Sequence, residues 1–494
     1  MKTSIENLFV LLALIAGLGL VSAARATAQT YTNLHSFNGT TDGNAPYAGL
    51  VLSGNTLYGT TYYPGYMSAG GTVFKVKTDG TGFTNLYIFT ALLGGFQTNS
   101  DGANPYAGLI LSSNILFGTT YHGGIYGNGT VFRINTDGTG FTNLYNFSMM
   151  DGFRHNNDGA NPQGGLVLSG NTLYGTANDG GSQGGGTIFA INTDGTGFTT
   201  LHTFSLNSNG TYLKSDGSFP EAGLILSGNT LYGTANEGGS SLYYGTVFKI
   251  NTDGSGYTTL HSFTATSGPY YTINSDGANP AAGLILSGNT LFGTAAFGGS
   301  SGNGTVFAVN TDGSSFTNMH SFTQTDNSGR NTDGGEPQAG LILSDNILYG
   351  TAYHLGSLGS GTVFAINTNG TDFTTLYTLN GPSDGAGLMA GLVLSGNILY
   401  GTASGGGNYS LGTVFSLSLG SVTVSAPQLT ILHSGANLIL TWPTNATGFT
   451  LQSTTNLAPP AVWTTNFPAP VVITGQNTVT NPITGSQKFY RLSQ

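Results

Sequence analysis

The chain alternates apolar and polar residues in short runs that recur along most of its length. In the run LVLSGNTLYGT, residues 50–60, Leu, Val and Tyr alternate with small or polar residues around a central Gly-Asn pair. Runs of this length, rich in Val, Ile, Tyr, Phe and Thr and bounded by turn residues, predict short β-strands. The run starts with Gly-Leu-(Val/Ile) in seven places, at Gly49, Gly108, Gly165, Gly223, Gly283, Gly340 and Gly391. A repeat of this kind predicts seven copies of one structural unit.

Each unit contains four such runs, so we expect four strands, a to d, in every copy. The first unit reads AGLVLSGNTLYGT, then a Gly-rich stretch, then GTVFKVKTDGTG and FTNLYIF. An Asn lies between runs a and b in every unit, and Asp-Gly or Asn-Gly lies between runs c and d in the first six. These residues favour tight hairpins. Four-stranded units repeated seven times predict an all-β, seven-bladed β-propeller over residues 29–420.

The seventh unit ends after GTVFSLSL, residues 412–419, without a run d. The missing run is YTNLHSF, residues 31–37, at the other end of the repeats. Leu34 and Phe37 occupy the places that Leu86 and Phe89 occupy in the first unit. We therefore expect the N-terminal segment to complete the last blade and to close the propeller.

The units resemble the GloVer (Gloeo/Verruco) tandem repeat of exported bacterial proteins. The resemblance rests on AGLxLSGNTLYGT, GTVF and TDGxxFTxLHxF, and it covers residues 31–419. It implies export and a repeat architecture, with C-terminal anchors that differ between members. It implies no activity and no catalytic residue.

The two ends of the chain differ from the repeats. Lys2 precedes an apolar run from Leu8 to Val21, and small residues precede Gln29. This pattern predicts a signal peptide over residues 1–28, with an uncleaved anchor as the alternative. Residues 421–428 are expected to form a linker. The alternating runs of residues 429–494 predict a small β-sandwich resembling a shortened fibronectin type III domain, with Trp442 and Trp463 in its core.

Charge and composition narrow the choice of partners. Only 6% of the residues are charged, the net charge is -10, and the 11 Lys and Arg residues form no cluster. Nucleic acid is therefore not an expected partner. There is no cysteine, so disulfides contribute nothing to stability. No second long apolar run follows the signal, so we expect a secreted or cell-surface monomer without a membrane span.

Strand order predicts that the b–c loops and the d–a connections share one face, and that the short hairpins share the other. The b–c loops are long and varied, and such loops on a regular scaffold are the usual place for binding. The position four residues after the Gly of each YGT or FGT motif varies in chemistry while its surroundings do not. Together with the aromatic residues of the b–c loops, it gives the candidate ligand-binding residues Tyr63, His122, Tyr126, Asp179, Glu237, Tyr244, Phe297 and His354.

Two sets of carboxylates suggest further possibilities. Asp179 and Glu237 come from neighbouring units and are candidates for the acid and base of a polysaccharide-active enzyme, since such enzymes use paired carboxylates. The ordinary interpretation is that they are solvated loop charges. A recurrent Asp-Gly before run a could bind calcium, although we favour a turn-capping role for Asp42, Asp101, Asp158, Asp216, Asp276, Asp333 and Asp384. No other cofactor is indicated.

The sequence therefore favours an exported, non-catalytic binding or adhesion module for glycans or other envelope components. Tyrosines near Asn and Gly on the variable face could stack on sugar rings and bond their hydroxyls. The first alternative is a hydrolase or lyase acting on polysaccharide. The second is a purely structural surface protein.

Overall fold

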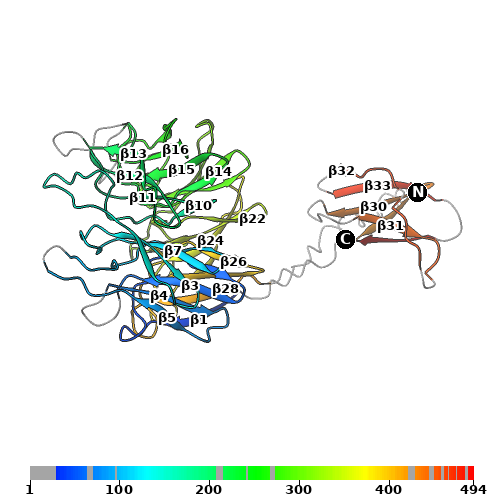
Figure 1. Ribbon diagram of the computed structural model, residues 1–494. Coiled ribbons are helices and arrows are strands. Elements are labelled where there is room, and N and C mark those ends of the chain that lie inside the picture. The colour runs from blue at the N-terminus through cyan, green and yellow to red at the C-terminus, as the bar shows by residue number, and fades with distance from the viewer. Residues whose placement is uncertain are drawn as a thin grey trace. The chain divides into compact units, whose positions relative to one another are not determined.

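The computed structural model describes residues 29–63, 70–94, 97–206, 215–240, 243–267, 273–420, 429–443, 450–457, 461–465, 467–473, 476–483 and 488–493. The predicted signal peptide and linker lie outside these residues. One compact unit spans Gln29–Leu419, and a second unit includes Gly420–Gln494. Every regular element that the structure describes is a β-strand (Figure 1). Within the described residues there is no helix of the length and apolarity that a membrane span requires.

Seven four-stranded antiparallel sheets make up the first unit, in the strand order predicted for each repeat. Sheet 1 contains β2 (Val51–Ser53), β3 (Thr56–Thr61), β4 (Thr72–Lys77) and β5 (Thr84–Ile88), in that order. Sheets 2 to 4 contain β6 (Ile110–Ser112), β7 (Ile115–Thr120), β8 (Thr130–Asn135) and β9 (Thr142–Asn146); β10 (Val167–Ser169), β11 (Thr172–Ala177), β12 (Gly184–Asn192) and β13 (Thr199–Ser205); and β14 (Ile225–Ser227), β15 (Thr230–Ala235), β16 (Thr246–Asn251) and β17 (Thr258–Ser262).

Sheets 5 to 7 repeat the pattern, with one difference in sheet 7. Sheets 5 and 6 contain β18 (Ile285–Ser287), β19 (Thr290–Ala295), β20 (Thr305–Asn310) and β21 (Thr317–Ser321); and β22 (Ile342–Ser344), β23 (Ile347–Ala352), β24 (Thr362–Asn367) and β25 (Thr374–Thr378). Sheet 7 contains β26 (Val393–Ser395), β27 (Ile398–Ala403), β28 (Thr413–Ser418) and, as its outer strand, β1 (Thr30–Ser36).

The hairpin chemistry matches the expected turns. Gly54 has a φ of 58° between β2 and β3, a conformation that glycine adopts without strain. Between β4 and β5, the Asp79 carboxylate accepts hydrogen bonds from the backbone and the hydroxyl of Thr81, 2.9 and 2.7 Å away. These short turns bring successive strands of one unit directly side by side.

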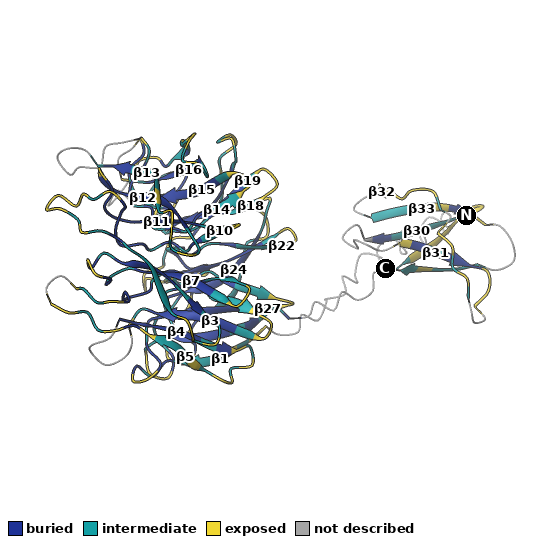
Figure 2. Ribbon diagram, in the orientation of Figure 1, coloured by how far each residue is buried: buried dark blue, intermediate teal, exposed yellow. Residues whose placement is uncertain are grey.

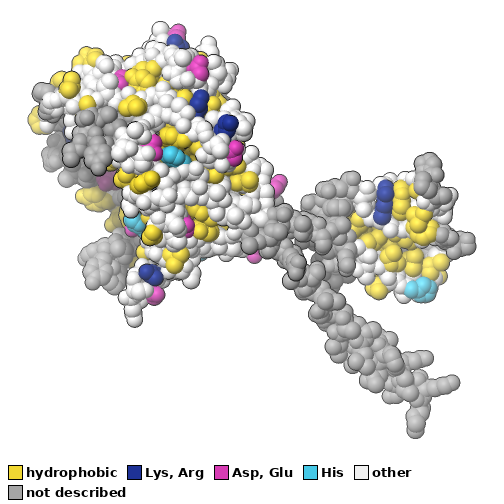
Figure 3. All heavy atoms as spheres, turned by 90° about the horizontal axis from the view of Figure 1, so that it is seen from below, with side chains coloured by type: hydrophobic (Ala, Val, Ile, Leu, Met, Phe, Trp, Pro, Cys, Tyr) yellow, Lys and Arg dark blue, Asp and Glu magenta, His cyan; other side chains and the backbone are white. Residues whose placement is uncertain are grey.

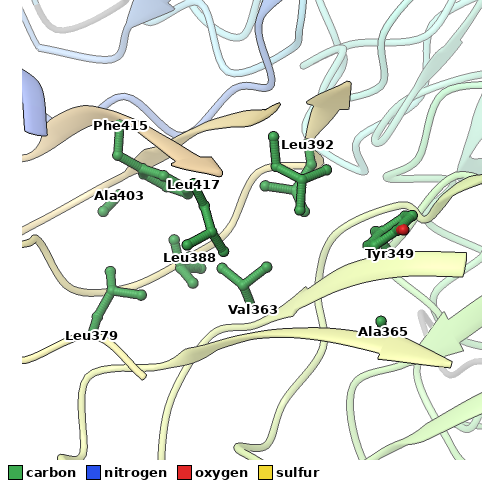
Figure 4. Packing of buried hydrophobic residues seen from close by; sticks show 10 residues of the cluster. Tyr349, Val363, Ala365, Leu379, Leu388, Leu392, Ala403, Phe415 and Leu417 are labelled. Atoms are coloured by element: carbon green, nitrogen blue, oxygen red, sulfur yellow. The ribbon is translucent and has the colours of Figure 1, made fainter. Parts of the chain in front are cut away.

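The middle strands are buried on both faces because each sheet is packed between two others (Figure 2). Between sheets 1 and 2 the core includes Tyr58, Val73 and Phe89 from the first and Leu109 and Phe132 from the second. Equivalent clusters lie between sheets 2 and 3, 3 and 4, 4 and 5, 5 and 6, and 6 and 7. The cluster between sheets 6 and 7 is shown in Figure 4. The hydrophobic positions of the repeat therefore form cores between units.

Sheet 7 packs on sheet 1 through the N-terminal strand. Strand β1 pairs with β28 in antiparallel register, from Thr30 opposite Ser418 to Ser36 opposite Thr413. Phe37 is fully buried and packs with Leu57 and Phe74 of sheet 1. This pairing confirms the prediction that residues 31–37 replace the missing fourth strand of the last unit.

Seven glycines bring the inner ends of the sheets into close contact. A Cβ placed on Gly223 would lie 2.8 Å from the carbonyl oxygen of Gly165. Each of the other six has its counterpart in the preceding sheet as its neighbour, and a Cβ on Gly49 would lie 3.2 Å from Gly391. The series of contacts thus returns to its starting point, and glycine allows an approach at the inner strand that a larger residue would hinder.

The second unit consists of a four-stranded and a two-stranded antiparallel sheet. The first contains β29 (Thr430–Ser434), β30 (Asn437–Pro443), β33 (Gln476–Pro482) and β32 (Val471–Ile473), and the second contains β31 (Thr450–Thr454) and β34 (Phe489–Ser493). Trp442 is buried with Leu440, Leu451 and Val479, as expected. Trp463 is only partly buried and lies under the guanidinium of Arg491, 4.2 Å from its ring centre, so its predicted place in the core is wrong.

Candidate functional site

The long b–c loops and the d–a connections lie on one face of the repeat region, residues 29–419, as the strand order predicts. In sheet 1, Asn44 of the connection forms a β-bridge with Tyr63 at the end of strand b. The equivalent bridge occurs in all seven units, for example between Ala160 and Asp179. The end of strand b is therefore fixed by a second segment on this face. Figure 3 shows how few and scattered the charged side chains are on the part of the surface it displays.

The seven aspartates of the d–a connections contact the fourth strand of their own sheets. Asp333 accepts hydrogen bonds from His320 Nε2 and from the backbone of Thr323, both at 3.0 Å. Burial alone would raise the pKa of Asp333, but these hydrogen bonds outweigh it and hold the pKa below its usual value. In each of the other six sheets the equivalent Asp lies against a His or a Tyr side chain. One pair differs: Asp216 and His202 are 3.5 Å apart and are not hydrogen-bonded.

The His or Tyr partner of each aspartate stacks on an aromatic ring of the next sheet. His320 lies parallel to Phe373 at 3.6 Å, and Tyr87 lies parallel to Phe141 at 3.8 Å. These contacts give the position a structural role. Among the residues that the structure describes, no group of three or more acidic or histidine side chains could hold a metal ion. Calcium binding stays a prediction, whereas the hydrogen bonds of Asp333 fit the turn-capping role that the sequence favours.

The predicted ligand-binding residues differ widely in exposure. Tyr63, Phe297 and His354 are exposed, and His122 is partly buried with Asn161 Nδ2 3.3 Å from its Nδ1. Burial lowers the pKa of His122. Asp179 is buried, which raises the pKa of its carboxyl. These side chains project from separate sheets, and none of them is in the wall of the central cavity.

Tyr126 and Tyr244 are further candidates from the b–c loops. Tyr126 is 41% exposed. Tyr244 is partly buried against the core between sheets 4 and 5, and Thr266 donates a hydrogen bond of 3.2 Å to its hydroxyl. Tyr244 therefore packs its own loop, whereas Tyr126 remains open to solvent.

A central cavity of about 170 Å³ lies where the inner ends of the seven sheets meet. Its walls come from three consecutive residues in each unit, which end at the Gly of the Gly-Leu-(Val/Ile) motif, and the first of these three varies in type: Tyr47, Tyr106, Gln163, Glu221, Ala281, Gln338 and Met389. The variation was visible in the sequence, since the neighbouring Ala and Gly hardly change. It is absent from the predicted site residues because those were chosen from the b–c loops, the end of strand b and the aspartates of the d–a connections.

Tyrosines gather around the mouth of this cavity. The ring of Tyr62, three residues after the Gly of its YGT motif, lies 5.3 Å from Tyr47 and 6.0 Å from Tyr106 between ring centres. Tyr47 and Tyr106 are themselves 5.2 Å apart. Burial and the nearby phenols raise the pKa of Tyr62 to about 12, so it stays protonated at neutral pH. Tyr353, from sheet 6, also acts electrostatically on Tyr47 and Tyr106.

Glu221 is the acidic residue of the cavity wall. Asn236 Nδ2 donates a hydrogen bond of 3.1 Å to its Oε2. Burial, with the nearby charges of Glu237 and Asp179, raises the pKa of Glu221 to about 7. The predicted pair Asp179 and Glu237 is thus brought near a third carboxylate that sequence analysis did not single out.

Asp179 is paired with a cation from another loop. The guanidinium of Arg154, which is more than half exposed, donates a hydrogen bond to the Asp179 carboxylate. The same guanidinium lies 6.0 Å from the centre of the Phe219 ring of the next unit. Asp179 is therefore paired with a cation, whereas the partner of Glu221 is the neutral amide of Asn236.

Solved structures similar to this chain are distant from it. PorZ, described as a bacterial surface component of the type-IX secretion system of Porphyromonas gingivalis, is 15% identical, with a TM-score of 0.44. The match covers 93% of this chain and 58% of the PorZ chain. An oligogalacturonate lyase from Vibrio parahaemolyticus is 9% identical, with 78% and 93% coverage and a TM-score of 0.45. No conclusion about activity follows from likeness at this level.

The sequence comparisons are more specific. No curated protein matches the chain. The pattern of the Gloeobacter/Verrucomicrobia repeat matches residues 15–155, 90–275 and 270–437, which together include all seven sheets. Its repeated units correspond to the four-stranded sheets, in a propeller-like arrangement. The chain belongs to the Gloeobacter/Verrucomicrobia repeat family.

Proposed function

We propose that the protein is an exported, non-catalytic binding module for glycans, with its site at the mouth of the central cavity. The observation that carries the proposal is the cluster of Tyr47, Tyr62 and Tyr106: Tyr47 and Tyr106 are in the wall of a polar cavity, and the half-buried ring of Tyr62 packs on both. Aromatic rings stack on sugar rings, and a few fixed polar groups then select the hydroxyls. Other envelope components with similar groups are possible ligands of the same surface.

The proposal takes the repeat region as a seven-bladed β-propeller and residues 429–494 as a small β-sandwich. The cycle of contacts from Gly49 to Gly391, and the core between sheets 7 and 1, support a closed arrangement. A common core between the two C-terminal sheets supports the sandwich. In such an arrangement the seven b–c loops and the seven d–a connections surround one mouth, which explains why Tyr62 of a b–c loop meets Tyr47 and Tyr106 of two d–a connections.

Export is part of the proposal, and it rests on the sequence of residues 1–28 and on the resemblance described above. The sparse charge and the absence of cysteine are compatible with an extracytoplasmic protein that depends on burial for stability. The C-terminal unit would then attach or display the repeat region at the cell surface.

A glycan array on the purified full-length protein, followed by calorimetric titration of the best ligand, tests the binding function. We expect Tyr106→Ala to weaken binding by about tenfold, since an aromatic contact is worth on the order of 1 kcal/mol beyond the apolar area that it buries. Tyr62→Ala should have a similar effect. Tyr126→Ala, which removes an exposed tyrosine away from the cavity wall, is the matched control and should leave affinity unchanged. Failure to bind any glycan, or equal loss in the control, contradicts the proposal.

A polysaccharide-active enzyme is the second candidate, and one observation favours it. Glu221, with a pKa raised to about 7, has the character of a general acid, and Glu237 lies near enough to act on it electrostatically. Asp179 fits this role less well because Arg154 pairs with it. Product analysis on glycans that bind decides the question. Turnover that is lost in Glu221→Gln would establish the enzyme, and binding without turnover would exclude it.

A further inference from the structure

Three carboxylates lie on the side of the cavity mouth formed by sheets 3 and 4. Glu221 is in the cavity wall and is influenced by both Asp179 and Glu237. Among the described residues, Arg154 is the cation bonded to this group, and it pairs with Asp179 alone. When the three acids are ionised, one guanidinium cannot balance them. The mouth therefore presents an excess of negative charge.

Two acceptor oxygens, one on an acid of this group and one on the residue before Asp179, have no hydrogen-bond donor. One is Oε2 of Glu237, and the other is Oδ1 of Asn178, a residue that is only 8% exposed. The hydroxyl of Thr176 donates to the carbonyl of Ala222, next to Glu221 in the cavity wall. Asn178 lies three residues after the Gly of its YGT motif, the place that Asn236 occupies in the next unit, and Asn236 reaches the cavity-wall residue Glu221 with a hydrogen bond of 3.1 Å. By this equivalence Asn178 is directed toward the mouth. A buried acceptor without a donor is costly unless a ligand supplies one.

The tyrosines complete a site that favours positive charge. The rings of Tyr47, Tyr62 and Tyr106 meet near the mouth, and the charge of Glu221 acts on Tyr106. The face of an aromatic ring attracts a cation, and an ammonium group carries three donors and no acceptor. An ammonium group would thus find negative charge, hydrogen-bond acceptors and aromatic faces at this mouth. An anionic sugar would meet repulsion, and a neutral one would leave the acids unbalanced.

We propose that the mouth binds a glycan bearing a free primary amine, such as a glucosamine polymer, with its ammonium group held by Glu221 and Glu237 and its rings on the tyrosines. This inference deepens the proposed function and depends on it. Asn178 accepts a further hydrogen bond from the amine or from a neighbouring hydroxyl. Acetylation of the amine removes the charge and two donors while the sugar ring remains.

The test is calorimetric titration of the full-length protein with three hexasaccharides: β-1,4-linked glucosamine, its fully N-acetylated form and galacturonate. We expect the glucosamine hexamer to bind at least about tenfold more tightly than the acetylated hexamer, since a charge-assisted hydrogen bond is worth that factor or more. Galacturonate should bind most weakly. Glu221→Gln, nearly identical in shape, should abolish the preference for the amine, and Glu237→Gln should reduce it.

Asp345→Asn is the control for net charge, because Asp345 is exposed in a hairpin on the opposite face. It should leave all three affinities unchanged. Equal affinity for the free and acetylated hexamers, or tighter binding of galacturonate, overturns this inference while the glycan-binding function stands. If the control loses the preference as fully as Glu221→Gln, nonspecific attraction explains it and the site is refuted. If no glycan on the array binds, both proposals fail.

Discussion

His35 of β1 is paired with Val414 of β28, although the two residues come from opposite ends of the repeat region. The pairing continues beyond the strand, where the amide of Phe37 donates a hydrogen bond of 3.0 Å to the carbonyl of Gly412. An edge strand without this partner would expose unpaired backbone groups and invite association. The N-terminal strand therefore both completes sheet 7 and protects its edge.

Phe37→Ala should destabilise the protein through this junction. Truncation of a fully buried phenylalanine costs about 3–5 kcal/mol, and Phe37 has no exposed surface. Ile88→Ala, at a half-exposed site of the equivalent strand in sheet 1, should cost much less. Chemical denaturation compares the two variants, and equal costs would contradict the contribution of buried Phe37 to this junction. Deletion of residues 31–37 should in addition produce oligomers in size-exclusion chromatography.

The glycine contacts offer a test with a matched control. Gly223→Ala places a Cβ 2.8 Å from the backbone oxygen of Gly165, whereas Gly165→Ala meets its neighbour Gly108 at 3.6 Å, an ordinary contact. We expect the first substitution to cost about 1–3 kcal/mol through overpacking and the second to be close to neutral. Thermal melting of both variants checks this, and the opposite order would contradict the close approach of the inner strands.

The aspartate of the d–a connection should matter most where its hydrogen bonds are complete. Asp333→Asn weakens the bonds from His320 and Thr323 and should cost roughly 1–3 kcal/mol. Asp216→Asn should cost less, because Asp216 is not hydrogen-bonded to His202 and its Oδ1 has no donor. Denaturant midpoints of the two variants give the comparison. Equal losses would argue against the hydrogen bonds as the source of stability.

Glu221 should make stability depend on pH. Its carboxyl has a pKa of about 7 in the folded protein, above the ordinary value of 4.5 for a glutamate, so the folded state favours the protonated form. The stabilising effect of that proton is complete below about pH 4.5 and is lost as the pH rises through 7. Glu221→Gln should therefore raise the melting temperature at pH 8 and change it little at pH 4. A variant that melts with the same difference at both pH values would contradict the raised pKa.

The fold was largely predictable because the same pattern of strands and turn residues recurs seven times in the sequence. The runs around Leu57 and Phe74 recur in every unit, and the absence of a fourth run after Leu419 pointed to residues 31–37. The site was less predictable. Glu221 faces the cavity only because seven inner strands meet there, and Arg154 reaches Asp179 from a different loop. Such contacts depend on how units pack, which no pattern within one unit encodes.

The most direct test of the binding account is a crystal structure of the protein with the oligosaccharide that binds it most tightly. The account predicts sugar density at the mouth of the central cavity, over Tyr62 and Tyr106 and within hydrogen-bonding distance of Glu221. Density on the outer loops near Tyr126, or on the C-terminal unit with the mouth empty, would contradict it.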